Sequence, residues 1–196
     1  MDAKTFYSKF KDAITETDYW KELYYGKSPE FTKSVTKEIN QIIESYPDYK
    51  VQNEYYRIDA IGWKHQNDEA KSEAIDVELN WHQWDLKIAV EHENDLADWT
   101  DELTKLIHIR CPLKVIIGYN HWDCREELEQ KKLAYAAKWM QHIKAFDPDA
   151  KEEYLIILGN TYSKNNKVKS TNFDYRGYLY DYETAQFIQL KDEAQK

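Results

Sequence analysis

Acidic side chains stand in two segments whose other residues are typical of buried β-strands. One segment contains Asp59, and the other, residues 84–93, ends in Glu91-His92-Glu93. Side chains alternate along a strand, so Glu91 and Glu93 point the same way, roughly 7 Å apart at ~3.3 Å rise per residue. Like charges side by side repel each other unless a cation or water intervenes. If Asp59 lies on a neighbouring strand, the three carboxylates predict a site for a hard divalent cation such as Mg²⁺.

The same alternation predicts which side of this strand is buried. Leu86, Ile88 and Val90 fall on one face, and His92 continues that face. Glu91 falls on the other face. We therefore expect His92 to be a core or supporting histidine rather than a metal ligand.

Composition restricts the class of protein. The chain has 196 residues, of which 32% are charged and 15% are aromatic, with 16 Tyr and 7 Trp. So many large aromatic side chains predict a folded chain despite the high charge. The formal net charge of −9 argues against non-specific binding along DNA, which needs a basic surface, but leaves room for a locally basic cleft around a metal.

The sequence gives little support for a zinc site, a disulfide scaffold, a membrane span or a signal peptide. Cys111 and Cys124 lack the spacing of a zinc site, and two cysteines cannot form a disulfide scaffold at this size. No apolar run approaches the length of a membrane span, and the N-terminus lacks the apolar core of a signal peptide. We expect a cytoplasmic protein that does not bind membranes.

Hydrophobic periodicity predicts alternating groups of helices and strands. Helices are expected over residues 4–25, from Ser28 to just before Pro47, over 95–108 and over 124–145. Strands are expected over 49–64, 74–81, 84–93, 113–119 and 154–159, followed by a C-terminal hairpin within about 173–191. This order predicts an α/β fold in which one mixed β-sheet is flanked by helices. We expect a single domain over residues 1–196, with its core within about 30–160.

Residues 30–120 resemble the PD-(D/E)XK nuclease superfamily, the restriction-endonuclease-like fold, whose core runs α-β-β-β-α-β. In that superfamily an Asp on one strand and a Glu on the next bind Mg²⁺. A Lys or Glu two residues after that Glu helps to position and activate the attacking water. The resemblance implies that Asp59 and Glu91 are metal ligands. Glu93 stands where the lysine usually does, as a further ligand or a base.

Glu93 in place of lysine departs from the usual motif, although Glu is a known variant among restriction enzymes. Many members of the superfamily instead carry the lysine on the following helix, and Lys105 is the candidate here. Lys87 is four residues from Glu91, ~13 Å along the strand, which is far for a shared site. Glu38 matches the acidic residue that the superfamily often has on its first helix.

The resemblance implies a Mg²⁺-dependent endonuclease, with Mn²⁺ as a substitute, that hydrolyses DNA and is related to restriction or repair enzymes. A carboxylate-bound metal can supply the nucleophile and neutralise the scissile phosphate, and a nearby Lys or Glu can orient the water. Two alternatives stay open. One is a catalytically inactive module on the same fold that binds a protein partner, which the net charge of −9 favours. The other is an acidic DNA-mimic or immunity-type protein. The sequence also leaves open a homodimer that cuts both strands.

Overall fold

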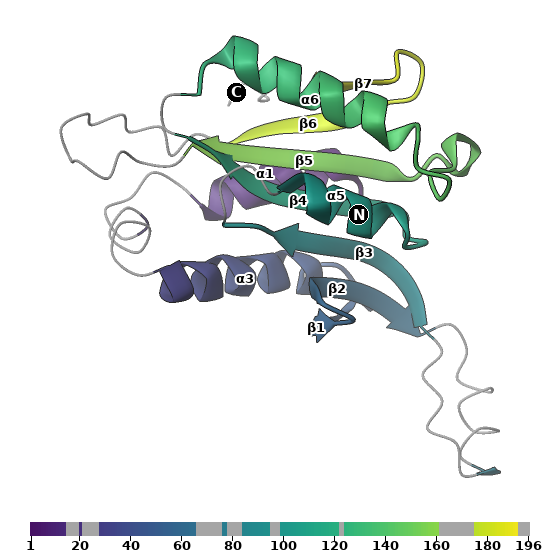
Figure 1. The fold of residues 1–196 in the computed structure, drawn as a ribbon. Helices are drawn as coiled ribbons and strands as arrows, with labels where there is room; N and C mark the ends of the chain where they lie inside the picture. The colour runs from purple at the N-terminus through teal and green to yellow at the C-terminus, as the bar shows by residue number, and fades with distance from the viewer. Residues whose placement is uncertain are drawn as a thin grey trace.

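The protein is built on one seven-stranded mixed sheet whose strands follow one another in chain order, β1 to β7 (Figure 1). The computed structural model describes residues 1–14, 20, 28–65, 76–77, 84–94, 99–121, 124–160 and 175–191. The strands are β1 (Lys50–Tyr55), β2 (Ile58–His65), β3 (Trp84–His92), β4 (Leu113–Asn120), β5 (Glu153–Asn160), β6 (Arg176–Asp181) and β7 (Gln186–Gln189). Strands β3, β4 and β5 are parallel, and the other neighbouring pairs are antiparallel. The predicted mixed sheet flanked by helices is confirmed.

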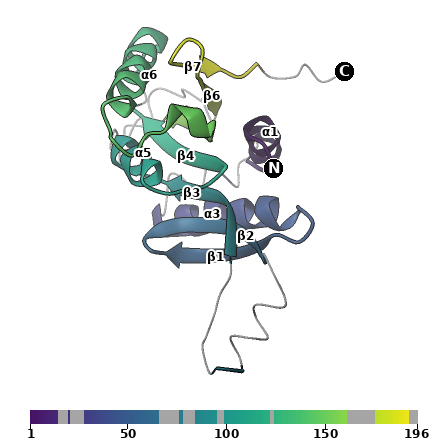
Figure 2. The same ribbon diagram turned by 90° about the vertical axis from the view of Figure 1, so that its right-hand side faces the viewer.

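Helices cover both faces of the sheet. Among the described residues they are α1 (Ala3–Ala13), α3 (Ser28–Glu44), α5 (Trp99–Ile107) and α6 (Glu126–Met140), with a short 3₁₀ turn, η1 (Pro148–Ala150). Figure 2 shows the sheet between α5 and α6 on one side and α1 and α3 on the other. Each face has its own apolar core, because residues that alternate along β2, β3 and β4 contribute in turn to the two clusters. None of the described helices is both long and apolar enough to cross a membrane.

Two predicted helices differ from the expectation. The helix predicted over residues 4–25 is interrupted after Ala13, since Ile14 leaves the helical conformation (φ −106°, ψ 75°). Of residues 15–25 only Trp20, which is helical, is among the described residues. The sequence that follows, Thr15 to Asp18, contains β-branched and aspartate residues of low helix propensity. The helix predicted over 124–145 stops at Met140, after which turns with hydrogen bonds three residues apart continue the chain.

Residues 49–64 are a hairpin rather than the single strand predicted. Tyr55 pairs with Ile58, so Tyr56 and Arg57 form a two-residue turn between β1 and β2. Both have positive φ, 49° and 64°. Turns of this kind normally contain Asn-Gly, and neither residue is present here, so the turn carries no sequence signal.

Strand β3 changes face at a bulge, which corrects a second prediction. Register shifts by one residue where β2 passes from Gly62, opposite Ile88, to Trp63, opposite Leu86. Leu86 therefore packs with the α5–α6 core, whereas Ile88 and Val90 belong to the α1–α3 core. His92 lies on the α1–α3 side as predicted, where its Nε2 is 2.9 Å from the Tyr119 hydroxyl.

The remaining predicted elements are found close to their expected places. Strands β4 and β5 and the terminal hairpin match the predicted segments. Helix α5 is described from Trp99 onward, and the start predicted for it at residue 95 lies outside the described residues. The predicted strand over 74–81 and its turn at 81–83 also lie outside them, apart from residues 76–77. These two residues are helical and in a turn, so the strand prediction is wrong at this point.

Helix α5 is held close to β4 by the absence of a side chain at Gly118. A Cβ built at this glycine would lie 2.7 Å from the Cβ of Trp99, a rigid part of that residue. We predict that Gly118→Ala pushes α5 off the sheet and lowers the free energy of unfolding by about 1–3 kcal/mol, measured by urea denaturation. Gln130→Ala, at an exposed position of α6, should stay within about 0.5 kcal/mol of wild type. Equal stability of the Gly118 variant and wild type would contradict the close packing.

Candidate active site

Strands β2 and β3 bring Asp59 and Glu91 together. Ala60 pairs with Val90, so Asp59 and Glu91 occupy the next position on each of these antiparallel strands. The Glu91 Oε2 atom lies 3.4 Å from the backbone nitrogen of Asp59, which donates to it. The backbone N–H of His92 in turn donates to Asp59 Oδ2 at 2.7 Å. Two carboxylates on facing strands repel each other, so this pairing needs a counter-charge.

Lys105 supplies positive charge from helix α5. Its Nζ lies 2.7 Å from Glu91 Oε1 and donates to the carbonyl oxygen of Arg57 at 2.9 Å. Leu103 and Leu106 pack into the α5–α6 core and thereby set the rotation of the helix that carries Lys105. The side chain proposed from the sequence as the relocated lysine therefore does contact Glu91.

Burial makes the charge on Glu91 costly. Its side chain is 2% exposed, and desolvation raises the pKa of Glu91 to about 8, although the hydrogen bond and charge of Lys105 act in the opposite direction. Burial also raises the pKa of Asp59 against the hydrogen bond from the His92 N–H. The pKa of Lys105 is raised as well, because its contacts with Glu102 and Glu91 outweigh its own burial.

Glu102 is a third acidic side chain at this place, and the sequence analysis missed it. Its Oε2 lies 2.5 Å from Lys105 Nζ, three residues along the same helix. Its negative charge contributes to the raised pKa of both Asp59 and Glu91. The signal available in the sequence was the spacing of Glu102 and Lys105, which places both on one side of a helix.

Glu93 and Glu38, also predicted for the site, are placed differently. Glu93 follows the last residue of β3, and its backbone N–H donates to Ile117 O at 2.9 Å. Glu38 lies on α3, which packs on the opposite face of the sheet from α5. Within the described residues, no hydrogen bond or ion pair joins either side chain to Asp59 or Glu91. Their predicted roles stay predictions.

The residues around Glu91 fit a Mg²⁺ ion. Glu91 Oε1 is buried and contacts the Lys105 ammonium at 2.7 Å, so this atom already faces a position that favours positive charge. The described part of the chain contains no group of three acidic, His or Cys side chains spaced to enclose a metal. Mg²⁺ commonly binds through one or two carboxylates and keeps waters or phosphate oxygens as its other ligands. Asp59 and Glu91 would be those two carboxylates.

Comparisons with known proteins add no family assignment. Neither the scan against protein-family models nor the search of curated proteins finds a match to this chain.

A second buried carboxylate, Glu129 on α6, shows what a structural ion pair looks like in this fold. Arg176 donates to both of its oxygens at 2.7 Å, and the Tyr178 hydroxyl donates at 2.5 Å. Burial alone would raise the pKa of Glu129, yet these hydrogen bonds lower it. Glu129 and Glu91 are both buried, but their pKa values shift in opposite directions. Perturbed carboxylates that lack such compensation are typical of functional sites.

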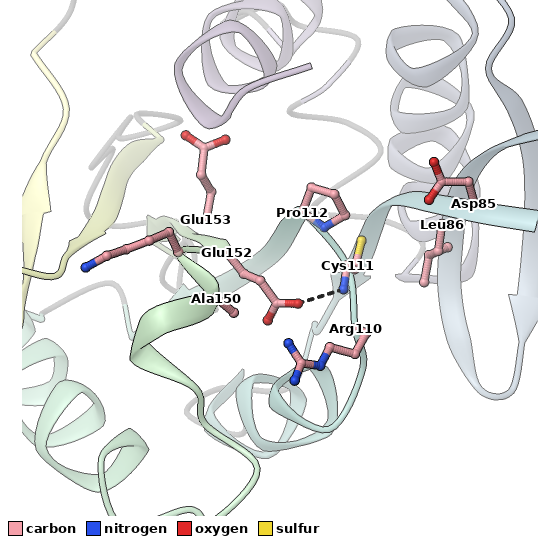
Figure 3. Close-up of a pocket in the computed structure, with 9 residues that line it drawn as sticks. Asp85, Leu86, Arg110, Cys111, Pro112, Ala150, Glu152 and Glu153 are labelled. Carbon is pink, nitrogen blue, oxygen red and sulfur yellow. Dashed lines mark hydrogen bonds between the residues drawn. The ribbon is translucent and has the colours of Figure 1, made fainter. Parts of the chain in front are cut away.

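The pocket in Figure 3 offers weaker chemistry. It has a volume of about 750 Å³ and lies where β4 and β5 begin. Cys111 lines it, but burial raises the pKa of this thiol to about 12, so it is not a reactive thiolate. Glu152 at the same pocket accepts from the Cys111 N–H at 3.0 Å and pairs with the buried Lys114. The charge of Glu152 is thus compensated within the protein.

The raised pKa of Glu91 predicts how stability depends on pH in the metal-free protein. Its value of about 8 in the folded state exceeds the ordinary 4.5, so the folded state binds more protons between these values. In EDTA, the free energy of unfolding should therefore fall as pH rises from about 5 to about 8. Glu91→Gln should reduce this fall, whereas Glu127→Gln, at an exposed ion pair, should retain it. Equal pH slopes for wild type and Glu91→Gln in urea denaturation would contradict the burial of Glu91.

Proposed function

We propose that the protein is a cytoplasmic, Mg²⁺-dependent nuclease of the PD-(D/E)XK type that hydrolyses phosphodiester bonds in DNA, with Mn²⁺ as a substitute metal. The observation that carries the proposal is the convergence of Asp59, Glu91 and Lys105 from two adjacent strands and the following helix. The order of elements supports it as well. Helix α3, strands β1 to β3, helix α5 and strand β4 follow one another as α-β-β-β-α-β, the order of that superfamily.

The charge balance of the site supports a bound divalent cation. Glu54 and Glu102 add to the negative charge around Asp59, and Glu91 lies on the neighbouring strand. Lys105 provides one positive charge against these carboxylates. A divalent cation between Asp59 and Glu91 would offset the remaining repulsion between the carboxylates. The same cation would neutralise charge on a bound phosphate.

Each residue has a distinct role in the proposed hydrolysis. When bound, a divalent cation supplies charge neutralisation at the scissile phosphate and a water of lowered pKa. Asp59 and Glu91 would hold that cation. Lys105 has its ammonium beside Glu91, from where it can donate to the attacking water or to a phosphate oxygen. The Arg57 carbonyl, which accepts from Lys105, fixes the direction of this side chain.

Cleavage of plasmid and single-stranded DNA in Mg²⁺ or Mn²⁺ tests the proposal. We expect Glu91→Gln, Asp59→Asn and Lys105→Met each to lower the cleavage rate by about 10²-fold or more, the usual contribution of such groups. Lys131→Met is the matched control, since Lys131 also pairs with a glutamate but lies exposed on α6. It should cleave at the wild-type rate.

Two outcomes would contradict the proposal in different ways. Equal cleavage by wild type and the three site variants would identify a contaminating nuclease. Mg²⁺ binding without cleavage of any DNA would favour the alternative of a binding or regulatory module on this fold.

Calorimetry with Mg²⁺ tests whether Glu102 or Glu93 is the third carboxylate that affects metal binding. Glu102 lies beside Lys105 and near both proposed ligands, whereas no hydrogen bond or ion pair of the described residues ties Glu93 to them. We predict that Glu102→Gln weakens Mg²⁺ binding several-fold, because Lys105 then competes more strongly for Glu91. Glu93→Gln should have a smaller effect. In a Lys105→Met background, the effect of Glu102→Gln should shrink if it acts through the lysine. A larger loss in Glu93→Gln than in Glu102→Gln would instead favour the ligand set predicted from the sequence.

A further inference from the structure

The turn between β1 and β2 has a backbone conformation that its residues do not favour. Tyr56 and Arg57 both have positive φ, and so does Glu54, which faces Asp59 across the hairpin. Residues with a Cβ rarely adopt this conformation, and a two-residue turn of this type normally takes Asn-Gly. Strain of this kind persists where the surrounding structure or the function requires it.

The side chains at this turn are presented to solvent. Tyr56 is 81% exposed and touches Tyr55 edge-on, with ring centroids 4.5 Å apart. Arg57 is exposed, and its guanidinium makes no hydrogen bond or ion pair with any described residue. A large aromatic ring and a cation that pairs with no described residue thus stand next to each other on a strained turn.

The turn is tied directly to the candidate active site. Lys105 donates to the Arg57 carbonyl at 2.9 Å while its Nζ also lies 2.7 Å from Glu91. Asp59 follows two residues after Arg57. Whatever Tyr56 and Arg57 bind is therefore adjacent to the carboxylates that would hold the metal.

We propose that the Tyr56–Arg57 turn binds single-stranded DNA beside the scissile phosphate. Tyr56 stacks on an unpaired base, and Arg57 contacts a backbone phosphate. The inference deepens the proposed nuclease function and rests on it for the position of the scissile bond. An exposed aromatic ring beside a cation is the combination that binds single strands, because every base offers a face for stacking. A paired base hides that face, so the substrate class is DNA with an unpaired base at the cut.

Stability and DNA binding should change in opposite directions when the turn is idealised. The double variant Tyr56→Asn with Arg57→Gly receives the residues that the backbone favours, so its melting temperature should rise by about 2–4 °C. Its affinity for a labelled single-stranded oligonucleotide should fall about tenfold or more, measured by fluorescence anisotropy in Ca²⁺ with product formation checked on a gel.

The single variants separate the two contacts. The loss of oligonucleotide affinity in Arg57→Gly should diminish at high salt, since the substitution removes a phosphate contact. The loss of affinity in Tyr56→Asn should be less sensitive to salt, and Tyr56→Phe should bind the oligonucleotide like wild type. Wild type should prefer the single strand over a blunt duplex of the same sequence, and Tyr56→Asn should lose this preference. Tyr135→Ala is the control and should bind normally, because this exposed tyrosine is on α6, which packs against β7 at the opposite edge of the sheet from β1 (Figure 1).

Several results would overturn the inference. Wild-type affinity in the double variant would do so, because the side chains of the turn would then not contact DNA. A lower melting temperature of the double variant would also do so, because the native turn would then not be strained. Failure of wild type to bind single strands would leave the turn as a contact for a protein partner. These outcomes are distinct from failure of the nuclease proposal. If the double variant loses single-strand binding while Glu91→Gln still yields wild-type cleavage, the DNA contact stands and the catalytic assignment fails.

Discussion

The buried charge of Glu91 is the constraint on which the candidate site depends. This carboxylate lies on a central strand, almost fully covered, with Asp59 at the next paired position of the neighbouring strand. A charge in such a place is tolerated only with a nearby cation. Lys105 provides that cation from α5, and α5 in turn can lie close enough only because Gly118 leaves room for Trp99. The packing of one helix on the sheet thus decides the electrostatics of the site.

The two buried carboxylates of this protein illustrate two uses of the same residue type. Glu129 is surrounded by donors from Arg176, Tyr178 and Asn120, which stabilise its ionised form. Glu91 shares one lysine with Glu102, and its second oxygen has only the backbone N–H of Asp59 at 3.4 Å as a donor. The first arrangement joins α6 to β6, whereas in the second a single lysine serves two carboxylates. This difference supports the proposed cation site, which rests on the convergence of Asp59, Glu91 and Lys105.

The β1–β2 turn also contains residues that its local structure does not favour. Asn-Gly would form it at lower cost, yet the chain has Tyr56 and Arg57 there, and both side chains are exposed. A strained residue whose side chain stays largely exposed is explained by a contact with another molecule, which is the basis of the proposed DNA contact. Lys105 connects this turn to Glu91, so metal, lysine and the proposed DNA contact would form one continuous surface.

Local sequence patterns determined much of this protein. The apolar runs of β4 and β5, the stripe of α3 and the acidic residues Asp59 and Glu91 within strand-like segments all follow from side-chain period and burial. The break between β1 and β2 could not be predicted, because its turn residues favour other conformations and are held by pairing on either side. The face reversal at Leu86 depends on a bulge, which changes register without changing composition. Only tertiary structure decided that the Glu102–Lys105 pair of α5 lies beside Glu91 and Asp59, whereas no described hydrogen bond or ion pair brings Glu93 to them. Alternation fixes the direction of side chains within one strand, but distances between strands and helices depend on how the elements pack.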